Sequence, residues 1–237
     1  MEQELHIPLQ DLKTAYGILR GDYTMPLIIF VHGLTSDKNE PKFYNGSRYF
    51  DKQGCATFRW SQYSWQNDAR KLHECTMSLH GKDLEAICAY FRMQGVKRII
   101  LVGHSMGALI ILHADQRYFN EVIFWDGSYK VERWLEGPDV VVEGIKARFI
   151  DCGFYAPLSD ALVEELKNTD YEEKLKNLQL PFSLIYAGEG ALLDGYDAYW
   201  KAAAHPHKRD ILPKAGHNFD EEGIEDLLFQ KTLEFLM

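Results

Sequence analysis

A serine stands between two glycines in the stretch Gly103-His-Ser-Met-Gly107, where a run of aliphatic residues ends. The preceding segment, 96–102, ends in β-branched and apolar residues, which favours a strand covered on both faces of a sheet. The following segment, 106–118, favours a helix, so the serine is predicted at a sharp strand-to-helix corner flanked by small residues. This Gly-x-Ser-x-Gly pattern is a nucleophile elbow, which exposes a serine hydroxyl at the top of a sheet. Ser105 is therefore the candidate nucleophile.

A serine hydroxyl is a weak nucleophile at neutral pH, so Ser105 needs a base that accepts its proton. The stretch Lys214-Ala-Gly-His-Asn-Phe219 follows the last predicted strand and places His217 on a glycine-bearing loop. The chain order, serine before histidine, differs from that of chymotrypsin and subtilisin and agrees with enzymes that carry a nucleophile elbow. We therefore expect His217 to be the base. His104, inside the elbow, is expected to pack around the site and not to act as a second base.

Attack on an acyl group places negative charge on the carbonyl oxygen, and two N–H groups must face that oxyanion. One N–H group usually belongs to the residue after the nucleophile, here Met106, and the other to an early loop. The stretch Phe30-Val-His-Gly-Leu-Thr35 leaves a predicted strand and turns at His32-Gly33, which makes Leu34 the second candidate donor. The alternative is that His32 and Gly33 form a tight turn and nothing more.

The bulk composition limits the class of protein. The chain has 237 residues, of which 46% are hydrophobic and 26% charged, so we expect residues 1–237 to form a single domain. It contains no apolar stretch of membrane-spanning length and no secretory signal, which predicts a cytoplasmic protein with no membrane partner. The net charge of −9 and the lack of a basic patch argue against nucleic acid as a partner. The sequence carries no signal for an oligomeric state.

Cysteine and histidine spacing favours neither a disulfide framework nor a metal site. None of the four cysteines lies in a Cys-x-x-Cys pair, which is typical of reduced thiols. The stretch His205-Pro-His207 has no acidic or cysteine companion nearby, and His73-Glu74 with His80 lacks the spacing of a His-Glu-x-x-His helix. We therefore expect no metal and no other cofactor.

The elements that must position these residues alternate between strands and helices. Strands are predicted at 27–31, 56–60, 98–102, 121–125, 182–187 and 208–212, and helices at 41–52, 79–94, 106–118 and 221–236. This alternation predicts an α/β fold with a mostly parallel central sheet flanked by helices, whose ligands bind at the carboxyl ends of the strands. Residues 128–180 interrupt the alternation. They are predicted to form a small cap over the site, or alternatively peripheral helices that contact no substrate.

Four stretches spread over most of the chain carry a family resemblance. They are His32-Gly-Leu-Thr-Ser-Asp-Lys38, Gly54-Cys-Ala-Thr-Phe-Arg-Trp60, Gly103-His-Ser-Met-Gly107 and Ala215-Gly-His-Asn-Phe219. In this order they resemble the α/β-hydrolase superfamily, and most closely the feruloyl or cinnamoyl esterases among its serine acyl hydrolases. The resemblance implies the α/β-hydrolase fold and cleavage of small-molecule carboxylic esters through an acyl-enzyme. The chain departs from the pattern at Ser61-Gln-Tyr-Ser-Trp-Gln-Asn67, where the group usually has a glycine-bearing turn, and this implies a different pocket shape.

A triad also needs an acid that orients His217 and stabilises its protonated form. In the resembled group an Asp usually stands three residues after the glycine that ends the penultimate strand. In this chain the stretch Gly188-Glu-Gly-Ala191 places Ala191 there. Another carboxylate must serve, or the triad is incomplete.

Three carboxylates could take this role. We favour Asp126, at the carboxyl end of strand 121–125, because it needs no change of register and because pancreatic-type lipases of this fold carry their acid after the equivalent strand. Asp194, three residues beyond Ala191, is the second candidate, and Glu189 is the third. The alternative for Asp126 is a carboxylate that only caps the turn at Gly127.

Two other classes of function keep the same fold. Ala191 at the usual acid position would also suit a non-catalytic binding protein with a decayed triad. An intact triad could instead serve a thioesterase, a hydrolase of C–C bonds or an acyl transferase, since pocket shape and water access decide among these reactions. The substrate class stays open among short acyl esters, hydroxycinnamate esters, thioesters and acylglycerols.

Overall fold

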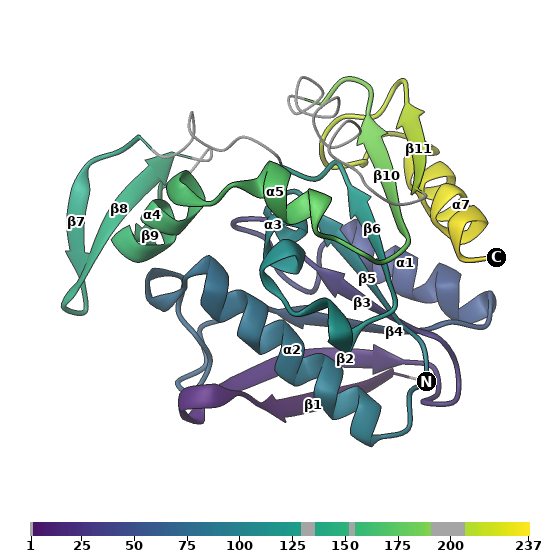
Figure 1. Cartoon of the computed structure of the whole chain (residues 1–237), viewed down its shortest axis with the longest axis horizontal. Coiled ribbons are helices and arrows are strands. Elements are labelled where there is room, and N and C mark those ends of the chain that lie inside the picture. The colour runs from purple at the N-terminus through teal and green to yellow at the C-terminus, as the bar shows by residue number, and fades with distance from the viewer. Residues whose placement is uncertain (1, 129–135, 152–154, 191–206) are drawn as a thin grey trace.

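The structure is a computed structural model that describes residues 2–128, 136–151, 155–190 and 207–237. These residues form an eight-stranded sheet in the order β1-β2-β4-β3-β5-β6-β10-β11 (Figure 1). The strands are β1 Glu2–Pro8, β2 Thr14–Arg20, β3 Leu27–Val31, β4 Ala56–Ser61, β5 Ile99–His104, β6 Glu121–Trp125, β10 Phe182–Ala187 and β11 His207–Leu212. From β4 to β11 every neighbouring pair is parallel, whereas β2 pairs antiparallel with both β1 and β4. The predicted mostly parallel sheet is confirmed.

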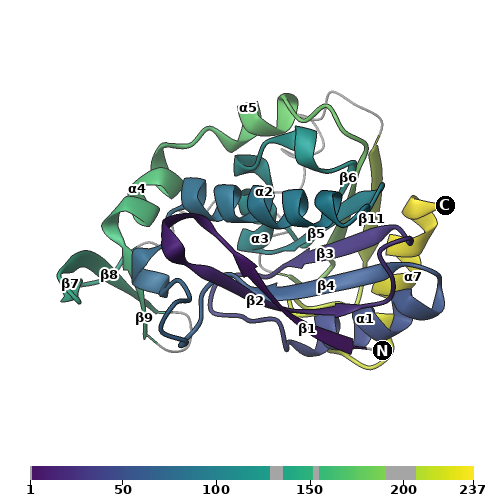
Figure 2. The same ribbon diagram turned by 90° about the horizontal axis from the view of Figure 1, so that it is seen from below.

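Helices cover both faces of this sheet. Figure 2 shows α2 (Met77–Met93) and α3 (Met106–His113) on one side, and α1 (Pro41–Lys52) and α7 (Ile224–Leu236) on the other. Two apolar cores result, one on each side of the central strands. A strand buried on both faces needs apolar residues at every position, and β3 and β5 are buried throughout. This is why their short, continuous apolar runs stand out in the sequence.

Two local features differ from the sequence-based expectation. The helix after Ser105 ends at His113, because Ala114 is extended and the Asp115 side chain accepts a hydrogen bond from the Arg117 N–H group, which begins a separate 3-10 turn. The β1–β2 hairpin was not predicted. Its first strand lies at the edge of the sheet and buries only two of its seven residues, so its sequence carries little apolar periodicity.

A second sheet lies in the insertion between β6 and β10. It consists of β7 (Asp139–Val142), β8 (Ile145–Asp151) and β9 (Tyr155–Ser159), and α4 (Asp160–Asn168) and α5 (Tyr171–Lys176) follow it. In Figure 1 this sheet projects from the main body on the side opposite to α7. The Ser159 hydroxyl donates to the Cys75 carbonyl at 2.6 Å, and the Ser78 N–H group donates to the Glu165 carboxylate at 2.8 Å. Helix α4 therefore lies beside α2, and the three strands before it were not predicted.

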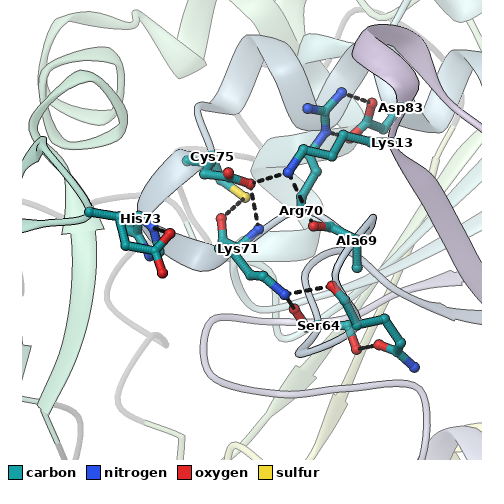
Figure 3. Close-up of polar contacts among 11 residues, drawn as sticks. Lys13, Ser64, Ala69, Arg70, Lys71, His73, Cys75 and Asp83 are labelled. Carbon is teal, nitrogen blue, oxygen red and sulfur yellow. Dashed lines mark hydrogen bonds and ion pairs between the residues drawn. The ribbon is translucent and has the colours of Figure 1, made fainter.

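Polar contacts fix the long connection between β4 and α2 (Figure 3). The Lys71 ammonium group donates to the carbonyls of Ser64, at 3.1 Å, and Gln66, at 2.5 Å. The buried Arg70 guanidinium group makes a two-pronged ion pair with Asp83 of α2, in which Nη2 lies 2.7 Å from Oδ1. Because the cation and the anion are both withdrawn from water, separating them would leave an uncompensated buried charge. The connection is therefore held in one conformation although it contains little regular structure.

Four histidines inside the fold are neutral. Burial lowers the pKa of His32 and His113 to about 4 and that of His80 to about 3, and it holds the pKa of His104 well below its usual range. In the unfolded chain these side chains titrate near pH 6.5. Below that pH the unfolded state therefore binds more protons than the folded state. The free energy of unfolding should fall as the pH drops from about 6.5 towards 4.

His80 offers a direct test of this balance. It is fully buried, and neither ring nitrogen has a hydrogen-bond partner in the described parts of the chain. An unpaired buried polar group is costly, so we expect His80→Leu to raise the free energy of unfolding at pH 7 by about 1 kcal/mol. The gain should be larger at pH 5, because the variant also removes a proton taken up on unfolding. Urea unfolding at both pH values measures this. The exposed His6→Gln is the matched control, and a loss of stability in His80→Leu at pH 5 would contradict the expectation.

Among the described residues, no helix has the length and apolar character needed to cross a membrane. Cys55, Cys75 and Cys88 are free and buried, whereas Cys152 lies outside the described residues.

Candidate active site

Ser105 lies at the corner between β5 and α3 in a strained backbone conformation, with φ 54° and ψ −123°. Only close packing holds an L-residue there. A Cβ atom on Gly107 would lie 2.1 Å from the Val31 carbonyl oxygen, and one on Gly103 would lie 2.8 Å from the Gly107 carbonyl carbon. Both flanking glycines are therefore required by the space around the corner, as the sequence pattern predicts.

Hydrogen bonds to β6 hold the same corner from the other side. The Ser105 N–H group donates to the Trp125 carbonyl at 3.2 Å, and the Ser128 N–H group donates to the Ser105 carbonyl at 3.0 Å. The hydroxyl oxygens of Ser105 and Ser128 lie 3.4 Å apart. Ser128 had no signal in the sequence except its place two residues after Asp126. The end of β6 thus fixes both the backbone and the surroundings of Ser105.

The structure brings His217 and Asp126 into contact. His217 Nδ1 lies 2.5 Å from Asp126 Oδ2, and the Asp126 side chain is fully buried. The other carboxylate oxygen, Oδ1, accepts the Ala187 N–H group of β10 at 3.2 Å. A carboxylate at Nδ1 keeps the proton on that nitrogen, so Nε2 of the neutral ring is left as the proton acceptor. This is the arrangement that a general base needs.

The sheet order explains this contact. Asp126 directly follows β6, the strand next to β5, and residues His104 and Trp125 are paired at the ends of these two strands. Asp126 also has a positive φ, 41°, and its N–H group donates to the Ile185 carbonyl at 2.8 Å. Strand β10 therefore holds both the backbone and the carboxylate of Asp126, and the carboxylate also contacts His217.

The other candidate acids differ in position. Glu189 is exposed, and its N–H group donates to the Ala215 carbonyl at 2.9 Å. A Cβ atom on the next residue, Gly190, would lie 2.8 Å from Asp126 Oδ2, so the start of this loop passes beside the Asp126 carboxylate. Asp194 and Ala191 lie outside the described residues.

The loop after β3 packs directly on the nucleophile. A Cβ atom on Gly33 would lie 2.9 Å from Ser105 Cβ and 3.4 Å from Ser105 Oγ. In the part of the chain that the structure describes, the N–H groups of Leu34 and Met106 donate to no backbone or side-chain acceptor. Both candidate donors therefore remain available to a ligand, and both flank Ser105 in the chain or in space.

Gly33 provides a test of this geometry. We expect Gly33→Ala to lower kcat/KM for an ester by about 100-fold, because the added methyl group pushes the loop that carries Leu34 away from Ser105. The overall fold should persist, since the clash involves the loop that follows β3 and leaves the strands and helices of the core unchanged. Steady-state kinetics and a thermal melt measure both effects. Gly95→Ala is the control for a substituted glycine away from the site: an added Cβ meets nothing within 4 Å there, although φ of +94° strains an alanine. Equal kinetics in the two variants would refute the placement of this loop.

His104 supports the loop that carries His217. Its Nε2–H group donates to the His217 carbonyl at 2.8 Å, and the two rings lie 4.7 Å apart. Its pKa is low because it is buried, so it stays neutral and packs against the loop. The structure thus places His104 beside His217, the candidate base.

The described residues contain no cluster of three or more His, Cys, Asp or Glu side chains that could hold a metal ion. His73 lies near Glu143 of the second sheet, at 3.4 Å, and His80 lies inside the core. His205 and the side chain of His207 lie outside the described residues.

Comparison with known proteins finds similar solved structures but no match by sequence. The chain matches no protein-family model and none of the curated proteins with which it was compared. Est1E from Butyrivibrio proteoclasticus with ferulic acid bound is 18% identical with a TM-score of 0.82, covering 98% of this chain and 97% of Est1E. The esterase domain of a Rhodothermus marinus protein is 18% identical with a TM-score of 0.77, covering 98% of this chain and 96% of that domain.

A third solved structure belongs to an enzyme of a different name. The dienelactone hydrolase of Anabaena variabilis is 14% identical with a TM-score of 0.73, and the match covers 100% of this chain and 97% of that one. Similarity at this level of identity concerns the fold. The parallel sheet, its helices on both faces and the insertion after β6 give this chain the α/β-hydrolase fold.

Proposed function

We propose that this protein is a serine hydrolase that cleaves carboxylic esters through an acyl-enzyme. The observation that carries the proposal is the 2.5 Å contact between His217 Nδ1 and the buried Asp126 carboxylate, next to a serine on a strained elbow. A decayed site has no need to keep a buried carboxylate on a partly exposed histidine. The fold shared with esterases and other hydrolases is consistent with this activity.

The proposed reaction has two halves. Ser105 Oγ attacks the ester carbonyl carbon while His217 Nε2 takes the hydroxyl proton, and the N–H groups of Leu34 and Met106 stabilise the oxyanion. The C–O bond to the alcohol then breaks, and the His217 proton passes to the leaving oxygen. In the second half a water molecule gives a proton to His217 Nε2 and attacks the acyl carbon. The bond from that carbon to Ser105 Oγ then breaks, and His217 returns the proton to Oγ, which releases the carboxylic acid and restores Ser105. Asp126 keeps the imidazole oriented throughout, and no cofactor enters these steps.

The proposed substrates are small-molecule esters handled by a single domain, with the insertion 128–180 as part of it. Est1E has been solved with ferulic acid, so a hydroxycinnamate ester belongs in the first substrate panel. The aromatic-rich stretch at 61–67, where the chain departs from the resembled pattern, argues for testing aliphatic esters beside it. The proposal covers both hydroxycinnamate and aliphatic esters.

The experiment is hydrolysis of p-nitrophenyl acetate, p-nitrophenyl butyrate and methyl ferulate, run with fluorophosphonate labelling and identification of the labelled peptide. Turnover of one ester and a label on the peptide that contains Ser105 would support the proposal. A protein that neither turns over these esters nor takes the label would overturn it and favour a binding protein. Labelling without ester turnover would direct attention to thioesters or C–C bonds.

A further inference from the structure

Two carbonyl groups of the loop after β3 face the residues that follow β4. Gln62 Nε2–H donates to the His32 carbonyl at 2.7 Å, and the Gly33 carbonyl accepts a hydrogen bond from His32 Nδ1–H at 2.8 Å. His32 Nε2 in turn accepts the Gln62 N–H group at 3.0 Å. Burial keeps the pKa of His32 at about 4, so the ring is neutral and can donate at Nδ1 while it accepts at Nε2.

Tyr63 completes this set of contacts. Its hydroxyl oxygen accepts a hydrogen bond from the Thr35 N–H group at 2.7 Å. The same hydroxyl donates to the Gly33 carbonyl, with 3.4 Å between the two oxygen atoms. Thr35 has a positive φ of 62°, which a threonine adopts only when its surroundings hold it there. Burial raises the pKa of the Tyr63 phenol, so the hydroxyl keeps its proton and can donate and accept together.

These contacts fix the direction of one candidate oxyanion donor. In a trans peptide the C=O and N–H groups point to opposite sides of the chain. The Gly33 carbonyl and the Leu34 N–H group belong to the same peptide unit. Holding the Gly33 oxygen towards His32 and Tyr63 therefore aims the Leu34 N–H group the other way, and Gly33 itself lies against Ser105.

We propose that Tyr63, together with Gln62, is a positioning residue that aims the Leu34 N–H group at the oxyanion. This inference rests on the proposed ester hydrolysis. Neither side chain contacts the reacting atoms in this role, because Tyr63 acts on the Gly33 carbonyl and Gln62 acts on the His32 carbonyl, one peptide earlier. Where the resembled esterases have a glycine-bearing turn, segment 61–67 therefore has side chains that hold the loop carrying Leu34.

Hydrogen bonds also hold the segment that carries Gln62 and Tyr63. The Ser64 N–H group donates to the Arg70 carbonyl at 2.8 Å, and Lys71 donates to the Ser64 carbonyl (Figure 3). Arg70 is paired with the buried Asp83 of α2. Tyr63 is thus tied to a core helix through its own neighbours. A side chain on a mobile loop would not hold a peptide group in place, but one anchored in this way can.

The test is Tyr63→Phe, which keeps the ring and removes the hydroxyl. We expect kcat for p-nitrophenyl butyrate to fall about tenfold with KM within about twofold, a smaller loss than removal of an oxyanion donor. An alkyl trifluoromethyl ketone, which forms a tetrahedral adduct with the active serine, should bind more weakly by the same factor, whereas butyrate should bind equally. Gln62→Met should act in the same direction, and Tyr44→Phe, an exposed tyrosine on α1, is the matched control.

The outcomes separate the two proposals. If wild type neither hydrolyses esters nor labels, the proposed function fails. If wild type is active and Tyr63→Phe matches it in kcat and in ketone affinity, this inference alone fails. A fall in kcat without the parallel loss of ketone affinity would also overturn it. The variant would then have lost something other than stabilisation of the tetrahedral state, such as the general stability of the fold. Circular dichroism melts of all variants identify any that are unfolded at the assay temperature.

Discussion

Replacing Ser105 with alanine is expected to lower kcat/KM for p-nitrophenyl butyrate by at least about 10⁴-fold and to abolish fluorophosphonate labelling. The reason is that Ser105, at the strained corner with φ 54°, is the proposed nucleophile, and an alanine there has no hydroxyl to form the acyl-enzyme. The smaller alanine side chain fits the same corner, so the fold should persist. Esterase kinetics, labelling and a thermal melt on the same preparations measure all three effects.

A neighbouring serine provides the control for this variant. Ser128 Oγ lies 3.4 Å from Ser105 Oγ and could in principle carry the label. Ser128→Ala should still be labelled at Ser105, whereas Ser105→Ala should carry no label at either position. If Ser105→Ala kept the activity of wild type, the elbow would not be the catalytic site. If both proteins were inert towards every ester and probe, the binding-protein alternative would become the better account.

Replacing Asp126 with asparagine is expected to reduce kcat/KM by about 10⁴-fold while the protein still folds. An asparagine amide can donate to Nδ1, which would move the ring proton to Nε2 and leave no acceptor for the Ser105 hydroxyl. The buried carboxylate also accepts the Ala187 N–H group, and an asparagine oxygen can keep that bond. The loss should therefore appear mainly in kcat and less in the unfolding midpoint.

Two matched variants decide which carboxylate serves. Glu189→Gln and Asp194→Asn should each keep kcat/KM within about threefold of wild type if Asp126 is the acid. A large loss in Asp194→Asn with a small one in Asp126→Asn would reverse the assignment. Equal, partial losses in both would indicate that the two carboxylates share the role. Urea unfolding of all three variants separates a catalytic loss from a folding defect.

The sequence predicted the parts of the fold whose burial is complete. Strands β3, β5, β6 and β10 are covered on both faces, so almost every residue is apolar and the pattern is clear. The β1–β2 hairpin and the β7–β9 sheet lie at exposed margins, where polar and apolar residues mix and local sequence carries little information. Both also pack against elements far away in the chain, as β9 does against the 3-10 turn at Leu72–Glu74.

The residues of the candidate site also differ in how far the sequence predicts them. Ser105 and His217 lie beside glycines in short, recognisable stretches, so both could be picked out from the order of residues alone. Asp126 was a preference among three acids, since the choice depends on which strand ends meet. Gln62, Tyr63 and Ser128 act through contacts between segments far apart in the chain, and their residue types have no distinctive spacing. Short glycine-bearing motifs thus identify Ser105 and His217 from local sequence, whereas only contacts between distant segments identify the residues that support them.

The close pairing of β5 with β6 has a consequence for how such a site can change over evolutionary time. Two of the three proposed catalytic side chains leave adjacent strands at the same level, and hydrogen bonds from Ser105 to Trp125 and from Ser128 to Ser105 lock these strand ends together. The spacing of nucleophile and acid is therefore inherited with the core of the sheet. The loops after β3 and β11 carry Leu34 and His217, so insertions and exchanges are better tolerated elsewhere, as in the segment between β6 and β10. Changes there can alter which molecules are accepted while the chemistry is preserved.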